Sequence, residues 1–288
     1  MTELFDNIRG IYDFSPPCEE LQPYVEFFSE SSPERTASLA ARKDFVVEMF
    51  PSWTPTFWIN LGAPYRLTTG HGSYLIPADS DILVLRDSIM TRHNRAADHL
   101  FSVKFFPGGL EAVLGVSQTK FIGAVVPLGH LLPAALIGQI KTAGSFQQRK
   151  TLLEDFFRTS LSHRPKKDHY SQLVRDSIGF YENAGMHPNT TELADRGFVH
   201  SRTINRYFHH VVGLAPKKYF TIVRARAALA GFLANRQQFT PEAFGYYDKS
   251  HFYKAVRQFT GRRIGEDSTG ERTTGERSTG ECRIADRP

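Results

Sequence analysis

Cysteine is scarce in this sequence, with only two among 288 residues. Cys18 and Cys282 are too few for a disulfide framework, and they lack the spacing of a metal site. The N-terminus has no basic segment followed by an apolar one, so we predict no signal peptide. Both observations fit a protein of the reducing cytoplasm.

Long apolar runs are also missing. The longest, Phe121–Ile140, is interrupted by Pro127, His130 and Pro133. A membrane span needs about 20 consecutive apolar residues, and proline breaks helices and sheets internally. A buried strand followed by a core helix therefore fits this run better than a membrane span, and no membrane partner is expected.

Sequence signatures of catalysis are not found either. The chain has no nucleophile elbow and no His/carboxylate metal spacing. The segment Gly70–Gly72 lacks the following helix and lysine of a phosphate-binding loop. His209 and His210 are adjacent, and adjacent residues on a helix do not share a face. We therefore predict that the protein is not an enzyme and holds neither a cofactor nor a metal.

Positive charge is concentrated in one segment. The net formal charge is +5, and residues 169–263 hold 14 Lys and Arg against 6 Asp and Glu. Residues 1–168 hold 17 basic and 18 acidic residues, and residues 264–288 hold 4 and 6. Contacts to phosphate dominate affinity for nucleic acid, so this basic segment is the electrostatic footprint that such a partner requires.

The segment 197–208 has the pattern of the turn and second helix of a helix-turn-helix. It follows a predicted short helix, Thr191–Arg196, and we expect Gly197 to allow the tight turn. The predicted buried stripe, at i, i+3 and i+4, is Ile204, Tyr207 and Phe208. The opposite side carries Arg202, Asn205 and Arg206. Arg can fork onto guanine and Asn onto adenine, so this face suits the major groove; a solvated helix face is the alternative.

The order of motifs over residues 169–263 resembles the DNA-binding domain of AraC/XylS-type transcription regulators. The first unit is matched by Leu193-Ala194 and Arg202-Thr-Ile-Asn-Arg-Tyr-Phe208. The linking segment is matched by Gly213-Leu-Ala-Pro216, Tyr219, Arg224 and Ala228. The second unit is matched by Gly245-Tyr-Tyr-Asp-Lys-Ser-His-Phe252, Phe259 and Gly261. The resemblance implies an all-α domain in which one long helix joins two helix-turn-helix units.

The resemblance also implies which residues contact DNA. The first recognition helix is expected at about 200–210 and the second at about 249–259, with Phe252, Val256 and Phe259 as its core. The predicted DNA-binding residues are His200, Ser201, Arg202, Asn205, Arg206, Lys217, Lys218, Lys249, Ser250, Tyr253 and Lys254. His200 replaces the Ser that the family prefers as N-cap, so capping there should be weaker or pass to Ser201. Lys217 and Lys218 are phosphate contacts or simply solvated lysines.

Residues 1–157 are predicted to form an α+β domain, with an antiparallel sheet or barrel plus helices. Short β-branched or aromatic runs punctuated by Gly and Pro predict strands at 44–50, 56–61, 81–85 and 100–106. Helices are expected at 131–143 and 146–157. The segments Val103-Lys-Phe-Phe-Pro-Gly-Gly-Leu110 and Val125-Val-Pro-Leu128 resemble an uncharacterised sensor-type domain found in some AraC-type regulators. Its aromatic strand residues either line a pocket or simply form the core.

Two further segments complete the domain organisation. Residues 158–168 are polar and basic with one proline, and are the predicted linker. Residues 264–288 hold three copies of a five-residue unit, Ser-Thr-Gly-Glu-Arg in the first, with no large apolar side chain. Such a segment cannot offset its ordering entropy, so we predict a disordered low-complexity tail.

The second unit departs from the family pattern in length. The stretch from Leu233 to Gly245 is shorter than usual, and 239–244 leaves room for barely one helical turn. The sequence therefore predicts a DNA-binding transcription regulator and leaves one alternative open. In that alternative, the N-terminal domain binds a ligand or a protein, and the second unit is degenerate. Expected partners are double-stranded DNA, a small-molecule effector, RNA polymerase and a second copy of the chain.

Overall fold

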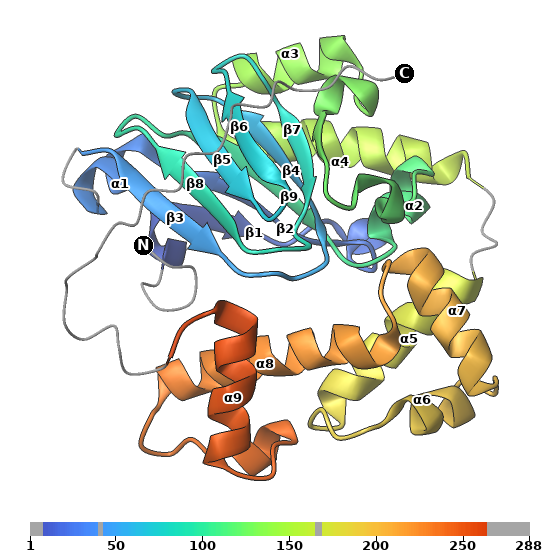
Figure 1. The fold of residues 1–288 in the computed structure, drawn as a ribbon. Coiled ribbons are helices and arrows are strands. Elements are labelled where there is room, and N and C mark those ends of the chain that lie inside the picture. Colours follow the sequence, from blue (N-terminus) through green and yellow to red (C-terminus); the bar gives the residue numbers. More distant parts are fainter. Residues whose placement is uncertain (1–7, 40–42, 165–168, 264–288) are drawn as a thin grey trace.

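The computed structural model describes residues 8–39, 43–164 and 169–263 (Figure 1). It has a sheet-rich N-terminal domain followed by an all-α C-terminal domain, so the predicted fold class is confirmed. In Figure 1 the N-terminal domain lies above the C-terminal helices.

Two antiparallel sheets build the N-terminal domain. The order of the first sheet is β1 (Tyr12–Ser15), β2 (Val25–Ser31), β9 (Leu100–Phe105), β4 (Pro55–Asn60), β7 (Ile82–Leu85) and β10 (Val125–Pro127). The order of the second is β3 (Phe45–Met49), β8 (Met90–Asn94), β5 (Tyr65–Thr69) and β6 (Gly72–Ile76). The four strands predicted from the sequence correspond to β3, β4, β7 and β9, and β1, β2, β5, β6 and β8 were not predicted.

Helices complete both domains. Those of the N-terminal domain are α1 (Pro33–Leu39), α2 (Gly109–Leu114), α3 (Ala134–Thr142) and α4 (Phe146–Ser162). Those of the C-terminal domain are α5 (His169–Asn183), α6 (Thr190–Arg196), α7 (Ser201–Val211), α8 (Pro216–Ala234) and α9 (Lys249–Thr260). Within the described residues, no helix is both long enough and apolar enough to cross a bilayer.

The predicted linker, 158–168, is shorter in the structure. Helix α4 continues to Ser162, because Phe156, Phe157 and Leu161 extend its apolar face against the core. Arg164 then turns back and donates to the backbone carbonyls of Val113 and Leu114. Residues 165–168 and the predicted tail at 264–288 lie outside the described residues.

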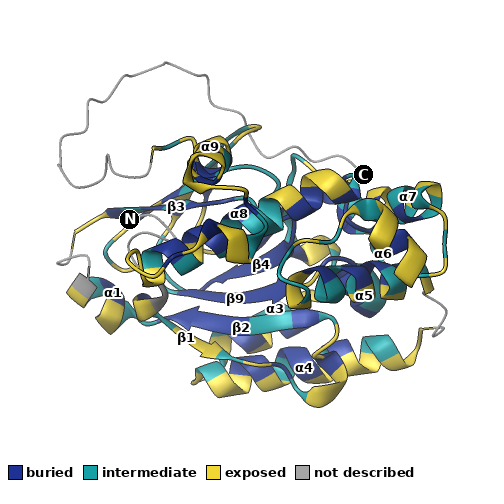
Figure 2. Cartoon of the chain, turned by 90° about the horizontal axis from the view of Figure 1, so that it is seen from below, coloured by how far each residue is buried: buried dark blue, intermediate teal, exposed yellow. Residues whose placement is uncertain are grey.

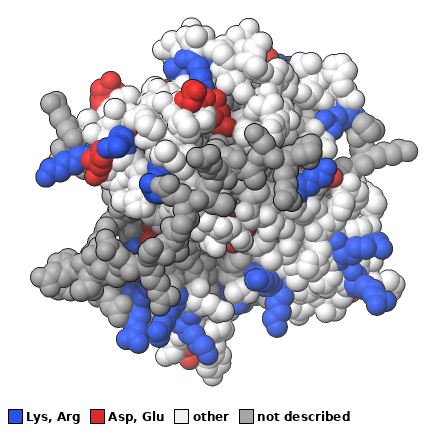
Figure 3. All heavy atoms as spheres, turned by 45° about the horizontal axis from the view of Figure 1, so that its top comes forward, with Lys and Arg blue, Asp and Glu red and all other residues white. Residues whose placement is uncertain are grey.

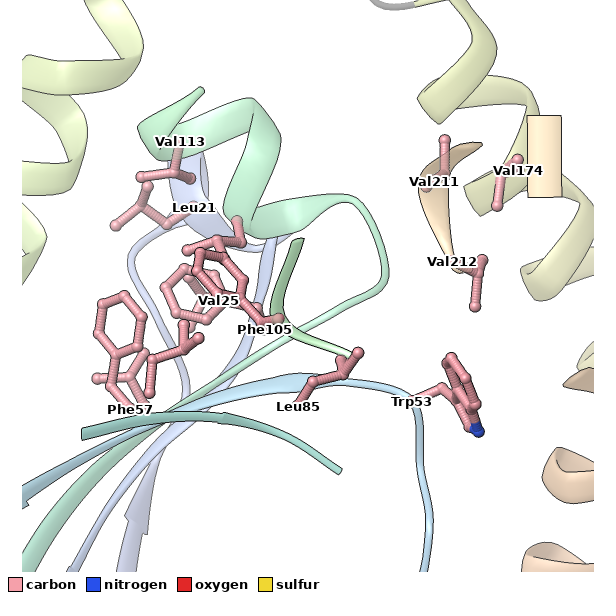
Figure 4. Packing of buried hydrophobic residues seen from close by; sticks show 14 of the residues in the cluster. Leu21, Val25, Trp53, Phe57, Leu85, Phe105, Val113, Val174, Val211 and Val212 are labelled. Atoms are coloured by element: carbon pink, nitrogen blue, oxygen red, sulfur yellow. The ribbon is translucent and has the colours of Figure 1, made fainter. Parts of the chain in front are cut away.

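One hydrophobic cluster runs through both domains. It joins core residues of the sheet such as Phe57 and Phe105 to Val174 on α5, and to Phe208 and Val212 at α7. Figure 4 shows Trp53, which follows β3, beside Val212. Helix α8 lies against the sheet, across β4 and β9 when seen from below (Figure 2). The C-terminal helices are therefore docked on the N-terminal domain by apolar contacts.

Candidate nucleic-acid interface

The first helix-turn-helix consists of α6 and α7. Helix α6 begins with the predicted capping box: the Asn189 side chain accepts from Thr191 N–H and Glu192 N–H, and the Glu192 carboxylate accepts from Asn189 N–H at 2.7 Å. In the turn between α6 and α7, Gly197 has an ordinary φ of −80° and Phe198 has the left-handed φ of 52°. Gly197 instead provides space, since an added Cβ would lie 3.2 Å from Leu173 Cδ1.

Helix α7 separates an apolar face from a polar one. Ile204 and Phe208 are fully buried, as predicted, and Tyr207 is half-buried with its hydroxyl 3.0 Å from His169 Nε2. Arg202 and Arg206 are exposed. Asn205 is half-buried and donates to the Ser201 carbonyl at 2.9 Å. Two guanidinium groups are thus free of the core, while contact with DNA stays a prediction for all three residues.

The N-terminus of α7 is weakly capped. His200 is the N-cap, with extended backbone at φ −74°, and within the described residues its side chain accepts no bond from the first turn. We expect His200→Ser to raise the free energy of unfolding by about 0.5–1 kcal/mol, because a Ser hydroxyl would accept an otherwise unpaired N–H. Chemical denaturation measures this change. Asn189→Ala, which removes an existing cap, should lower stability by about 1 kcal/mol. A loss of stability in both variants would contradict the assignment of His200 as a weak N-cap.

Helix α8 joins the two units. Its 19 residues give it a length of about 28 Å at 1.5 Å per residue, close to the roughly 34 Å between successive major grooves on one face of a duplex. It begins with Pro216 at its first turn, followed by exposed Lys217 and Lys218. Figure 1 shows α7 and α9 at opposite ends of α8. The two lysines therefore lie beside the carboxyl end of α7.

The second unit is short, as the sequence indicated. In place of a helix behind α9 there is one 3-10 turn, Pro241–Phe244. Phe244 lies over Gly231 of α8, where an added Cβ would be 2.6 Å from Phe244 Cζ. Phe232, Phe239 and Phe252 meet beside it, with ring centroids 4.6–5.5 Å apart. Aromatic packing thus fills the place of the missing helix.

The turn of the second unit is tied to α8. Arg224 donates to the Gly245 carbonyl at 3.2 Å, and its guanidinium lies 4.8 Å from the centre of the Tyr246 ring. Asp248 caps α9 by accepting from His251 N–H at 2.7 Å. The His251 and Tyr246 rings meet edge to face, with their centroids 5.1 Å apart. The start of α9 is therefore well fixed.

Helix α9, like α7, has one buried apolar face and one exposed polar face. Phe252, Val256 and Phe259 are buried, as predicted for its core. The opposite face exposes Lys249, Ser250, Tyr253 and Lys254. The first unit, α6 and α7, lies at one end of α8, and the second unit, the 3-10 turn and α9, lies at the other. The C-terminal domain is a double helix-turn-helix.

Comparisons with known proteins give distant likeness to solved structures only. No protein-family model and no curated protein matches the sequence. A structure of ToxT from Vibrio cholerae is 12% identical with a TM-score of 0.47, covering 78% of this chain and 96% of that one. ToxT bound to an unsaturated fatty acid is 12% identical, with a TM-score of 0.44 and coverages of 77% and 90%. The AraC-like transcriptional activator CuxR is 10% identical, with a TM-score of 0.25 and coverages of 78% and 89%. These values carry no conclusion about what this chain binds.

Positive charge is concentrated on the side of the double helix-turn-helix. On the face drawn in Figure 3, Lys and Arg predominate along the lower part, on the side of the C-terminal helices, whereas the upper part carries both signs.

Two exposed aromatic residues lie in the turns of the double helix-turn-helix: Phe198, 96% exposed, and Tyr247, 86% exposed. No role was predicted for either residue from the sequence. In the part of the chain that the structure describes, no cluster of His, Cys, Asp and Glu could hold a metal.

A cavity of about 490 Å³ lies between the N-terminal sheet and helices α5 and α8. Its apolar wall includes Phe27, Trp58, Ile222 and Val223. Its cationic side chains are Arg86, Arg92, Lys104 and Arg226, against the carboxylates of Glu26 and Glu182. Among the aromatic residues of the strands, Trp58 lines the cavity, whereas Phe57 and Tyr65 are core residues.

Three of these cations are buried: Arg86, Arg92 and Lys104. Lys104 pairs with Glu26 at 2.7 Å; burial lowers the pKa of its ammonium group, and the Glu26 carboxylate opposes that shift. Arg92, 1% exposed, donates to the Tyr12 hydroxyl at 2.8 Å and to Asp98 at 3.2 Å. Its Nε and Nη1 have no hydrogen-bond partner among the described residues. The cavity therefore has cationic side chains beside an apolar wall. These residues were not predicted from the sequence, although a cation inside an apolar run, as at Val103-Lys104-Phe105, is a usable signal.

Proposed function

We propose that this protein is a sequence-specific, double-stranded DNA-binding transcription regulator. The observation that carries the proposal is the placement of α7 and α9 at opposite ends of α8, each with a buried apolar face and an exposed polar one. A helix of this kind enters a major groove, and two such helices about one duplex repeat apart can read successive grooves. The excess of basic residues over 169–263 supports the same partner.

The proposal includes a small-molecule effector in the interdomain cavity. Cavities of roughly 300–1,000 Å³ with apolar walls and a few polar groups are the usual sites of small ligands. Four cationic side chains face two carboxylates on the cavity wall, so the cavity favours an effector with an acceptor or anionic group. We propose an amphipathic molecule whose acceptor group meets these cationic side chains and whose body packs on the apolar wall at Trp58. RNA polymerase and a second copy of the chain remain predicted partners.

Selection of bound duplexes from a random DNA pool by the full-length protein tests the proposal. A consensus with two half-sites about one helical turn apart is the expected result. A consensus with one half-site would leave α7 as the only reader, as in the alternative with a degenerate second unit. Recovery of no consensus would contradict DNA reading and favour a module that binds a ligand or a protein.

Lys217 and Lys218 are expected to contact phosphate, because both are exposed at the start of α8 beside α7. Replacing both with Gln should weaken binding to specific and random duplexes alike. It should also reduce the slope of log affinity against log salt by about 1–2. Binding titrations at several salt concentrations measure the slope. An unchanged slope would mean that these lysines are only solvated, and Lys43, a lysine of the N-terminal domain, provides the matched Lys43→Gln control.

A further inference from the structure

One short segment of the N-terminal domain contacts the carboxyl ends of both reading helices. This bridging segment, residues 48–54, connects β3 to β4. Its first half reaches α9 and its second half reaches α7. Helix α8 alone would hold α7 at its carboxyl end and α9 at its amino end. The bridging segment therefore adds a further attachment at the carboxyl end of each helix.

The contact with α9 consists of an apolar pair and an ion pair. The fully buried Phe50 packs its ring 5.3 Å from that of Phe259. It belongs to the same buried cluster as Phe232 and Phe252, so an N-terminal residue completes the core of the second unit. Directly after α9, Arg262 Nη2 lies 2.9 Å from the Glu48 carboxylate. The shortened second unit thus draws part of its support from the N-terminal domain.

The contact with α7 depends on Trp53 and Gln118. An added Cβ on Gly213, just after α7, would lie 3.3 Å from Trp53 Cζ3. The buried Gln118 side chain donates to the Trp53 carbonyl at 3.1 Å and to the Val212 carbonyl at 3.0 Å. Its own carbonyl accepts from Gly108 N–H at 3.1 Å. One amide therefore ties the bridging segment to the end of α7.

Arg86 fixes the shape of the bridging segment. The Arg86 carbonyl accepts from the N–H groups of Ser52 and Trp53, both at 2.9 Å, and its guanidinium donates to the Phe50 carbonyl at 2.6 Å. Trp53 holds a left-handed φ of 52°, which non-glycine residues rarely adopt without such support. Arg86, Ser52 and Thr54 also line the cavity. The segment that reaches both helices is therefore a wall of the cavity as well.

We propose that the bridging segment positions the two reading helices for DNA. Glu48 and Phe50 fix the position of α9, and Trp53, together with Gln118, fixes the position of α7. The inference rests on the proposed function and adds to it. It predicts that each contact controls only the half-site read by its own helix. Loss of a merely structural contact would instead weaken binding at both half-sites together.

The test uses the full-length protein and its selected operator. Two further duplexes have one or the other half-site scrambled, and the discrimination at a half-site is the Kd for its scrambled duplex divided by the Kd for the intact operator. For Glu48→Arg, discrimination at the α9 half-site should fall about tenfold, with the α7 half-site changed by less than about twofold. Phe50→Ala should act in the same direction. Gln118→Met, which keeps the volume but removes the amide, should give the opposite pattern.

The charge exchange Glu48→Arg with Arg262→Glu should restore discrimination at the α9 half-site, since both side chains are partly exposed and the reversed pair can form. This variant keeps the test valid even if Phe50→Ala does not fold. Equal loss at both half-sites, or no loss in any variant, would overturn the inference. Wild-type protein that reads only the α7 half-site would overturn it while leaving DNA binding intact. If the wild-type protein selects no operator at all, the proposed function itself is refuted.

Discussion

Arg206→Ala is expected to weaken binding to the selected operator by ~1–3 kcal/mol, about 5–150-fold in Kd. The side chain is exposed on α7, with its guanidinium 5.4 Å from the centre of the Tyr207 ring and no place in the core. Its removal should therefore cost little folding stability, and the loss would come from the missing bidentate contact with a base. Binding to a random duplex should change much less, so sequence preference should relax. Titration of both duplexes measures the difference.

Arg158→Ala provides the matched control for this experiment. Arg158 lies on α4 in the N-terminal domain, half-exposed and paired with Glu20 at 3.0 Å. Exposed ion pairs contribute little to stability, so this variant should bind both duplexes as the wild-type protein does. A loss in Arg206→Ala that is equal on operator and random DNA would identify a phosphate contact. Unchanged binding to the operator would contradict the assignment of α7 as a reader.

The reading helices could be predicted from sequence because their signals are local. The apolar stripe of α7 and the core of α9 repeat at helical spacing, and the cap at Asn189 lies three residues from its partner Glu192. The exposed positions then follow from geometry. The turn was harder, because its left-handed residue is Phe198 and not a glycine, the residue that takes this conformation most readily. The docked Leu193 and Val199 on either side leave this bulky residue outside.

Five strands of the N-terminal domain escaped prediction, and in one of them, β8, the cause is that inward positions are polar. In β8, Met90-Thr-Arg-His-Asn94, both Arg92 and Asn94 are buried. Arg92 lies between the Trp58 and Tyr65 rings and pairs with Asp98. Alternation of apolar and polar residues is the usual signal of a strand. It fails where a buried cation replaces an apolar residue, as expected at a ligand site.

The cavity and the bridging segment depend on contacts between distant parts of the chain. Glu48 meets Arg262, and Trp53 meets the end of α7 through Gln118. No spacing along the sequence encodes these pairs. The shortened second unit suggested a weak reader, since its supporting helix is reduced to one turn. Phe50 comes from the other domain to close that core, which explains how a short unit can still hold α9 in place.

The Pro107-Gly108-Gly109 element forms the turn after β9, and it also joins the domains. Gly108 has a left-handed φ of 76°, and an added Cβ would lie 2.8 Å from Val211 Cγ1 of α7. Gly109 begins α2 against the backbone of Tyr24, whose carbonyl accepts from Phe106 N–H at 2.9 Å. This close approach of three backbone segments leaves no room for a side chain.

Gly109→Ala is therefore expected to destabilise the protein by about 3 kcal/mol, lowering Tm by roughly 5–10 °C. Its Cβ would lie 2.0 Å from the Tyr24 carbonyl oxygen, which belongs to the backbone and cannot rotate away. Relief of the clash would displace the segment that precedes β2, together with Gly108 and its bond to Gln118. Gly138→Ala on α3 is the control: its Cβ would meet no described atom within 4 Å, so stability should rise by up to about 1 kcal/mol. Equal unfolding temperatures for Gly109→Ala and the wild-type protein would mean that α2 can move away from Tyr24 at no cost, contrary to the packing observed.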